Sequence, residues 1–105
     1  MLNNTFRVYS KNKKYDILML CTRLADVTGR VIYEGDVVQC DDKRSTQFPT
    51  IVGEVIYNPK YARFEVRTEG SCYSFEHLED ILILGCVYEQ PELLRINLYN
   101  NREDT

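Results

Sequence analysis

Residues 29–38 have the sequence Gly29-Arg30-Val31-Ile32-Tyr33-Glu34-Gly35-Asp36-Val37-Val38, a pattern typical of a tight turn that leads the chain into a β-strand. Gly35 has no Cβ and stands where the chain must change direction, which predicts a backbone with positive φ. Asp36 is expected to hold the turn through hydrogen bonds to nearby amides. The hydrophobic residues that follow then begin the strand.

A second informative stretch is Gly85-Cys86-Val87-Tyr88-Glu89-Gln90-Pro91-Glu92-Leu93-Leu94. Its apolar start continues the run 81–88, which we expect to form a centrally placed strand. Pro91 at a first helical position, with Glu92 directly behind it, predicts a short helical turn after that strand.

The rest of the chain is also typical of a β-protein. Apolar or alternating runs of strand length recur roughly every 8–12 residues between turn-forming segments, which fits a small barrel or a strongly bent sheet. In Arg63–Arg67 the alternation predicts Phe64 and Val66 inward and the charges outward. The aromatic share of 11%, with eight tyrosines, favours strands over helices.

Composition limits the classes of protein to which the chain can belong. An apolar share of 44% in 105 residues excludes disorder and supports one domain with its own core. No apolar run approaches the roughly 18 residues of a membrane helix, and the first residues lack the regions of a signal peptide. We therefore expect a cytoplasmic protein that does not associate with membranes.

The charge is unevenly distributed, although the net charge is only −3. Residues 1–52 carry eight Lys or Arg against six Asp or Glu, whereas residues 53–105 carry five against ten. An acidic second half argues against a general DNA-binding surface, because phosphate contacts need clustered cations. The cations available for such a surface are Lys11, Lys13, Lys14, Lys43, Arg44, Lys60 and Arg63.

The residues that bind metals or catalyse reactions are scattered. No two of the four cysteines lie within four positions of each other, which disfavours a zinc site, and we expect reduced thiols that are buried or half-buried. These are Cys21, Cys40, Cys72 and Cys86. The single histidine, His77, lies among Glu76, Glu79 and Asp80, a group better explained as a solvated acidic surface than as a metal site. We expect no cofactor.

Two carboxylates remain as candidates for chemistry. Glu34 and Glu89 each follow a tyrosine, and they form a paired acid–base site if the fold brings them together. A turn or partner-contact role is the better explanation of both, and no phosphate-binding glycine loop is present. The sequence therefore predicts a protein that is not an enzyme.

The order of motifs along the chain resembles the YopX-like proteins of phages and prophages. The matching segments are Phe6-Arg7-Val8-Tyr9, Thr22-Arg23-Leu24, Ile32–Val38 and Gly85–Leu94. The sequence departs from that pattern where Tyr9-Ser10 replaces Trp-Asp, Arg23 replaces glycine and Gln90 replaces asparagine. The residues of the fold signature are Tyr33, Glu34, Gly35, Asp36, Gly85, Tyr88, Glu89 and Pro91.

This resemblance implies an SH3-like β-barrel and a phage or prophage origin, with no accepted activity. We expect residues 1–24 to form an N-terminal strand segment that packs on a barrel of residues 25–96. A polar tail of residues 97–105 would follow the barrel, and the whole would be one domain with a short C-terminal helical turn.

The favoured function is a non-enzymatic protein-interaction module that binds a host or phage protein, or another copy of itself. The alternative is a nucleic-acid-binding accessory protein that uses a basic loop surface. Tyrosine and arginine together are typical of interface anchors, and tyrosine also stacks on single-stranded bases. The candidate partner-binding residues are Tyr61, Lys60, Arg63, Lys43 and Arg44, in the loops around residues 41–48 and 58–63.

Overall fold

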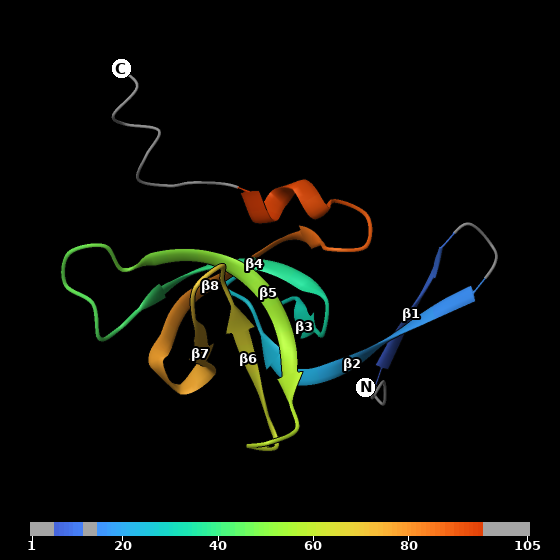
Figure 1. The fold of residues 1–105 in the computed structure, drawn as a ribbon, viewed down its shortest axis with the longest axis horizontal. Coiled ribbons are helices and arrows are strands. Elements are labelled where there is room, and N and C mark those ends of the chain that lie inside the picture. The colour runs from blue at the N-terminus through green and yellow to red at the C-terminus, as the bar shows by residue number, and fades with distance from the viewer. Residues whose placement is uncertain (1–5, 12–14, 96–105) are drawn as a thin grey trace.

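Eight β-strands and two short 3-10 helices make up the described part of the protein, residues 6–11 and 15–95, in a computed structural model (Figure 1). In chain order the elements are β1 Phe6–Lys11, β2 Tyr15–Ala25, β3 Val31–Tyr33, β4 Asp36–Asp42, β5 Thr50–Asn58, β6 Arg63–Arg67, β7 Cys72–Ser74, η1 Phe75–His77, β8 Leu78–Cys86 and η2 Pro91–Arg95. The helical turn predicted at Pro91 is η2.

The strands form two antiparallel sheets, one with the order β1-β2-β3 and one with the order β7-β6-β5-β4-β8. In the larger sheet β4 and β5 curve strongly over the other strands (Figure 1). Its outermost strands, β7 and β8, do not pair with each other, so the described sheet is not a closed barrel. The prediction of a mainly β protein is confirmed, in its bent-sheet form.

The predicted division of the chain at residues 24 and 25 stays a prediction. The predicted polar tail, residues 97–105, lies outside the described residues.

The main core lies inside the bend of the larger sheet. Cross-strand partners such as Val55 and Val66 are fully buried there, and burying one such side chain contributes about 1.5–3 kcal/mol. The buried members of this cluster are Ile32, Val38, Cys40, Val55, Val66, Leu78 and Ile83. A second, smaller cluster of Met19, Tyr33 and Cys86 lies where β2 and β3 meet the larger sheet.

The strand β8 lies at an edge of the larger sheet, so the prediction of a central strand is wrong. Its outer side is covered by the turn that follows β2. There the Val27 amide donates to the Ile81 carbonyl at 2.8 Å, and the Ile83 amide donates to Asp26 Oδ2 at 3.0 Å. A turn therefore takes the place of a neighbouring strand, which explains why β8 is as apolar as a central strand.

Two further predictions about side chains are wrong. Glu65, expected to face outward, is only 2% exposed, because Arg63 Nε at 2.7 Å and Asn58 Nδ2 at 3.1 Å donate to its carboxylate. The hydrogen bond from Arg63 holds the pKa of Glu65 below its usual range. Cys72 is exposed, whereas Cys21, Cys40 and Cys86 are buried or half-buried as predicted. Burial raises the pKa of Cys40 to about 12.

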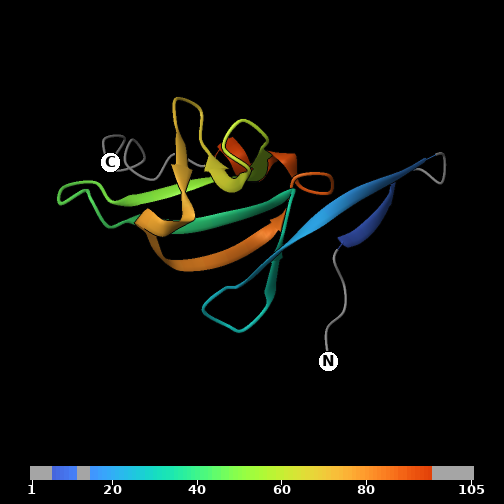
Figure 2. The ribbon, with the colours of Figure 1, turned by 90° about the horizontal axis from the view of Figure 1, so that it is seen from below.

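The hairpin of β1 and the first half of β2, residues 6–11 and 15–20, is called the arm below. Its pairing runs from Phe6 opposite Leu20 to Lys11 opposite Tyr15. The arm projects from the body of the protein in both views (Figures 1 and 2). The radius of gyration is 14.4 Å, against about 13 Å for a compact chain of this length.

Candidate functional site

The turn between β3 and β4 holds the signature residues Tyr33, Glu34, Gly35 and Asp36. Gly35 has a φ of +94°, and Asp36 Oδ2 accepts a hydrogen bond from the Tyr33 amide at 2.8 Å, so both predicted turn roles are confirmed. The buried Asp36 also accepts a charge-assisted bond from Arg7 Nη2 at 2.6 Å. The Arg7 guanidinium lies over the Tyr33 ring, 4.5 Å from its centre. This turn therefore attaches the arm to the body.

The second signature segment packs on the same turn. The Gly35 amide donates to the Val55 carbonyl, and the Gly35 carbonyl accepts from the Val87 amide, both at 2.8 Å. A Cβ on Gly35 would lie 2.7 Å from Tyr88 Cε2. The Tyr88 ring in turn stacks on Tyr9 of the arm, with the ring centres 6.0 Å apart. The two signature segments are thus one structural junction.

Gly85 and Pro91 complete this junction. A Cβ on Gly85 would collide with the side chains of Gln90 and Leu93, so glycine allows the segment after β8 to fold back against the strand. Pro91 begins η2, which carries Leu93 into this contact.

The carboxylates of Glu34 and Glu89 have different surroundings. Glu34 Oε1 accepts a hydrogen bond from the Leu20 amide at 3.3 Å, which is a structural role. Glu89 lines a pocket of about 250 Å³ at the base of the arm, and Glu34 is not among the lining residues. That pocket is bounded by Arg7, Val8, Tyr9, Met19, Arg30, Asp36, Gly85, Cys86 and Glu89.

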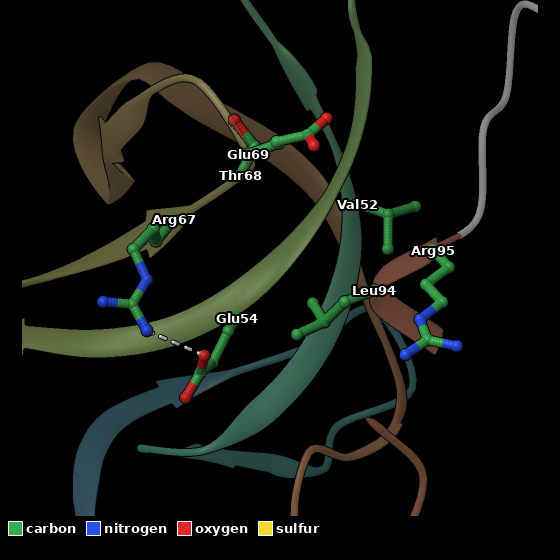
Figure 3. Close-up of a pocket in the computed structure, with 7 residues that line it drawn as sticks. All are labelled: Val52, Glu54, Arg67, Thr68, Glu69, Leu94 and Arg95. Carbon is green, nitrogen blue, oxygen red and sulfur yellow. Dashed lines mark hydrogen bonds and ion pairs between the residues drawn. The ribbon is translucent and has the colours of Figure 1, made fainter. Parts of the chain in front are cut away.

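A larger pocket of about 500 Å³ lies between β5, β6 and η2 (Figure 3). Its lining residues are Val52, Glu54, Arg67, Thr68, Glu69, Leu94 and Arg95. Arg67 and Glu54 form an ion pair of 3.0 Å across the sheet. With two acidic and two basic side chains around Val52 and Leu94, the pocket has no excess of either charge to select an anion or a cation.

The family model described as YopX protein matches residues 2–95, which include both signature segments and every described strand. The chain belongs to the YopX family. No curated protein matches the chain. The signature residues of this family member form the junction between arm and body.

In this YopX-family protein the loop between β5 and β6 brings three of the predicted partner-binding residues together. Tyr61 is 57% exposed, and its ring centre lies 5.4 Å from Lys60 Nζ and 5.0 Å from Arg63 Cζ. Arg63 is also paired with the buried Glu65. These three residues form an exposed aromatic and cationic group, called the Tyr61 cluster below.

Lys43 and Arg44 lie far from the Tyr61 cluster. They follow β4, next to the start of β5, whereas the Tyr61 cluster follows the end of β5. A nine-residue strand separates the two groups by up to about 26 Å. Arg44 Nε is moreover paired with Asp42 at 3.1 Å. Of the other predicted cations, Lys13 and Lys14 lie outside the described residues.

His77 ends the short helix η1, where its Nε2 lies 3.2 Å from Glu76 Oε2. Within residues 6–11 and 15–95, no three His, Cys, Asp or Glu side chains lie close enough together to hold a metal ion. The same residues contain no helix that is long and apolar enough to cross a membrane.

The structure reveals an apolar surface on the arm that the sequence analysis missed. Phe6, Val8, Leu18 and Leu20 are 36–54% exposed, and the pairing places Phe6 opposite Leu20 and Val8 opposite Leu18. These four residues are called the arm face below. The alternate residues Tyr9, Ile17 and Met19 pack toward Tyr33 and Cys86. The signal in the sequence was the run Ile17–Cys21, which is apolar on both faces of its strand.

Proposed function

We propose that this protein is a phage- or prophage-encoded accessory protein that acts as a non-enzymatic protein-interaction module. The observation that carries the proposal is the arm face, four exposed apolar side chains on a projecting hairpin. Membership in the YopX family supports the phage setting.

The arm face differs from ordinary scattered surface hydrophobics because its members are neighbours. Residues directly opposite each other in antiparallel strands have Cβ atoms about 4.5–5.5 Å apart, so the pairs Phe6–Leu20 and Val8–Leu18 form one patch. Apolar side chains that are exposed together, and not scattered singly, are typical of a surface that contacts another protein. Since the arm projects from the body, a partner can approach this patch freely.

The roles of Asp26, Glu34 and Asp36 support a binding function over catalysis. Asp36 binds Arg7 and the turn amide, Asp26 binds three backbone amides and the Thr28 hydroxyl, and Glu34 binds the Leu20 amide. Each of these carboxylates stabilises the fold through its hydrogen bonds. A general base instead needs a free path to a substrate proton.

The test is affinity capture from a lysate of the bacterial host, with the wild-type protein and three variants as bait. Leu18→Asp places a charge in the arm face, and Tyr61→Asp alters the Tyr61 cluster. Val27→Asp is the matched control, because Val27 is also exposed but lies in the turn after β2. We expect one specific partner that Leu18→Asp loses and Val27→Asp keeps. Capture that Leu18→Asp leaves intact contradicts the proposed role of the arm face.

A second candidate function is nucleic-acid binding, which the Tyr61 cluster favours because an exposed aromatic ring between cations can stack on a base. The distance between this cluster and Lys43 and Arg44 weighs against it, since a phosphate backbone requires cations along one face.

A further inference from the structure

Among the described residues, four strands lie at the edge of a sheet, and three of these edges are protected. The strands β3 and β7 contain only three residues each, and the turn at Asp26 and Val27 covers β8. The strand β1 has six residues, no proline and no bulge in its pairing with β2. Since proteins normally shorten, cover or interrupt exposed edges, the edge of β1 is the exception.

The hydrogen bonds of Leu20 show which backbone groups of β1 face this edge. The Leu20 amide donates to Glu34 Oε1, and the Leu20 carbonyl accepts from the Glu34 amide at 2.8 Å. Both groups of Leu20 therefore point away from β1, so Phe6 and Leu20 form a non-hydrogen-bonded pair. Because the pattern alternates along an antiparallel strand, the N–H and C=O groups of Phe6, Val8 and Ser10 point outward.

We propose that a second copy of this chain pairs its β1 with this edge, antiparallel and around a two-fold axis at Val8. This inference rests on the proposed function and names a second copy as one partner of the arm, bound at its edge and not at the arm face. In this register Val8 lies opposite the partner subunit's Val8, and Phe6 lies opposite the partner subunit's Ser10. Each of the three resulting pairs exchanges two N–H···O bonds.

The charge of Arg7 and the length of β1 exclude the two neighbouring symmetric registers. An axis at Arg7 would place two arginines directly opposite each other, which destabilises a sheet. An axis at Tyr9 would leave the outward groups of Phe6 without a described partner residue. The axis at Val8 instead places Arg7 opposite the partner subunit's Tyr9, and it uses all three outward residues.

The pairing produces a continuous sheet with the order β3-β2-β1-β1-β2-β3. The same residues meet on both sides of the axis, as a two-fold interface requires. The arm faces of both copies then lie on the same side of this sheet and meet at the axis, where Leu18 and Val8 continue into the partner subunit's Val8 and the partner subunit's Leu18. The dimer thus enlarges the surface proposed to bind a further protein.

The test compares the molar masses of the wild-type protein and its variants in solution, by light scattering and sedimentation. We expect the wild-type protein to reach twice the protomer mass of 12.4 kDa as concentration rises. Val8→Asp and Val8→Lys each place like charges opposite each other at the axis, so each alone should remain a monomer. An equal mixture of the two should recover the dimer, because the charges are then opposite.

Leu18→Asp is the matched control, since it puts the same charge into the arm face one strand away from the axis. We expect this variant to keep the dimer. A monomeric wild-type protein, a dimer that persists in Val8→Asp, a mixture that stays monomeric, or a dimer lost in Leu18→Asp each overturns the edge pairing. Val8 is 48% exposed, so its variants should fold, and circular dichroism checks this.

These results can be separated from the test of the proposed function. A dimer with no captured partner would contradict only the binding of a further protein. A captured partner with a monomeric wild-type protein would contradict only the pairing of β1.

Discussion

Asp26 joins two parts of the chain that lie 57 positions apart in sequence. Its Oδ1 accepts hydrogen bonds from the Thr28 and Arg30 amides and the Thr28 hydroxyl, and its Oδ2 accepts one from the Ile83 amide. The bonds from the Ile83 amide and from Thr28 lower the pKa of Asp26 from 3.8 to about 2. Asp26 is therefore a structural carboxylate that fixes the turn over the edge of β8.

This pKa predicts how the contribution of Asp26 to stability depends on pH. Because the pKa is lower in the folded state, the contribution is complete above pH 3.8 and is lost as the pH falls through about 2. Asp26→Asn should be less stable than the wild-type protein at neutral pH, because its amide nitrogen would face the Ile83 amide. Urea unfolding should show that the difference in the free energy of unfolding between the two proteins shrinks as the pH falls from 3.8 to about 2. A difference that stays constant down to pH 2 contradicts the stabilising role of the ionised Asp26 carboxylate.

The ion pair of Arg7 and Asp36 predicts a second effect of a single residue on stability. Arg7→Leu leaves the buried Asp36 without its charged partner, so we expect a loss of about 2–3 kcal/mol in the free energy of unfolding. Arg67→Leu is the control, because Arg67 and Glu54 form a more exposed pair and the loss should stay below about 1 kcal/mol. Equal losses in denaturant unfolding would show that Arg7 does not anchor the arm.

The role of a residue could be predicted from the sequence where it depends on neighbours in the chain. It could not be predicted where it depends on a partner far away in the sequence. The positive φ of Gly35, the acceptor role of Asp36 and the exposure of Tyr61 were predictable, because each follows from the residue and its neighbours. The bond between Asp26 and Ile83 was not, since it depends on how strands far apart in the chain are arranged. The burial of Glu65 was missed for the same reason, as Asn58 belongs to the neighbouring strand.

At the scale of elements, the turn before β4 and the segment after β8 depend on each other. Gly35 and Gly29 both have positive φ, so an alanine at either position costs about 1–2 kcal/mol in backbone strain. Only at Gly35 would the new Cβ also collide with Tyr88 and crowd Met19, whereas nothing lies within 4 Å at Gly29. Gly35→Ala should therefore destabilise the protein by about 1–3 kcal/mol more than Gly29→Ala.

Thermal and urea unfolding of the two glycine variants measures this difference. If Gly29→Ala and Gly35→Ala lose the same stability, the contact between the turn and Tyr88 contributes nothing to the fold.

The placement of whole strands was only partly predictable. Apolar runs identify strands, but they do not show which face of a strand is covered or which neighbours it has. The run of residues 81–88 is apolar throughout although β8 is an edge strand, because a turn covers its outer side. Ile17–Cys21 is apolar on both faces although Leu18 and Leu20 are exposed.

For the whole molecule, Lys43 and Arg44 lie at one end of β5, Lys60 and Arg63 lie at the other end, and the net charge is −3. We therefore expect no binding to single- or double-stranded DNA or RNA in anisotropy titrations, even at low salt. Binding that weakens steeply as salt rises, and that Lys60→Ala reduces, would contradict this expectation and favour the nucleic-acid alternative.

Amide hydrogen exchange measured by NMR shows residue by residue whether the outer edge of β1 pairs with a second copy. The Arg7 and Tyr9 amides point toward β2, so they should be protected at every protein concentration. The Phe6 and Val8 amides point outward, so their exchange should slow as the concentration rises and the copies pair. Fast exchange at Phe6 and Val8 at all concentrations, with Arg7 and Tyr9 still protected, would mean that the edge of β1 stays unpaired and that the proposed dimer does not form.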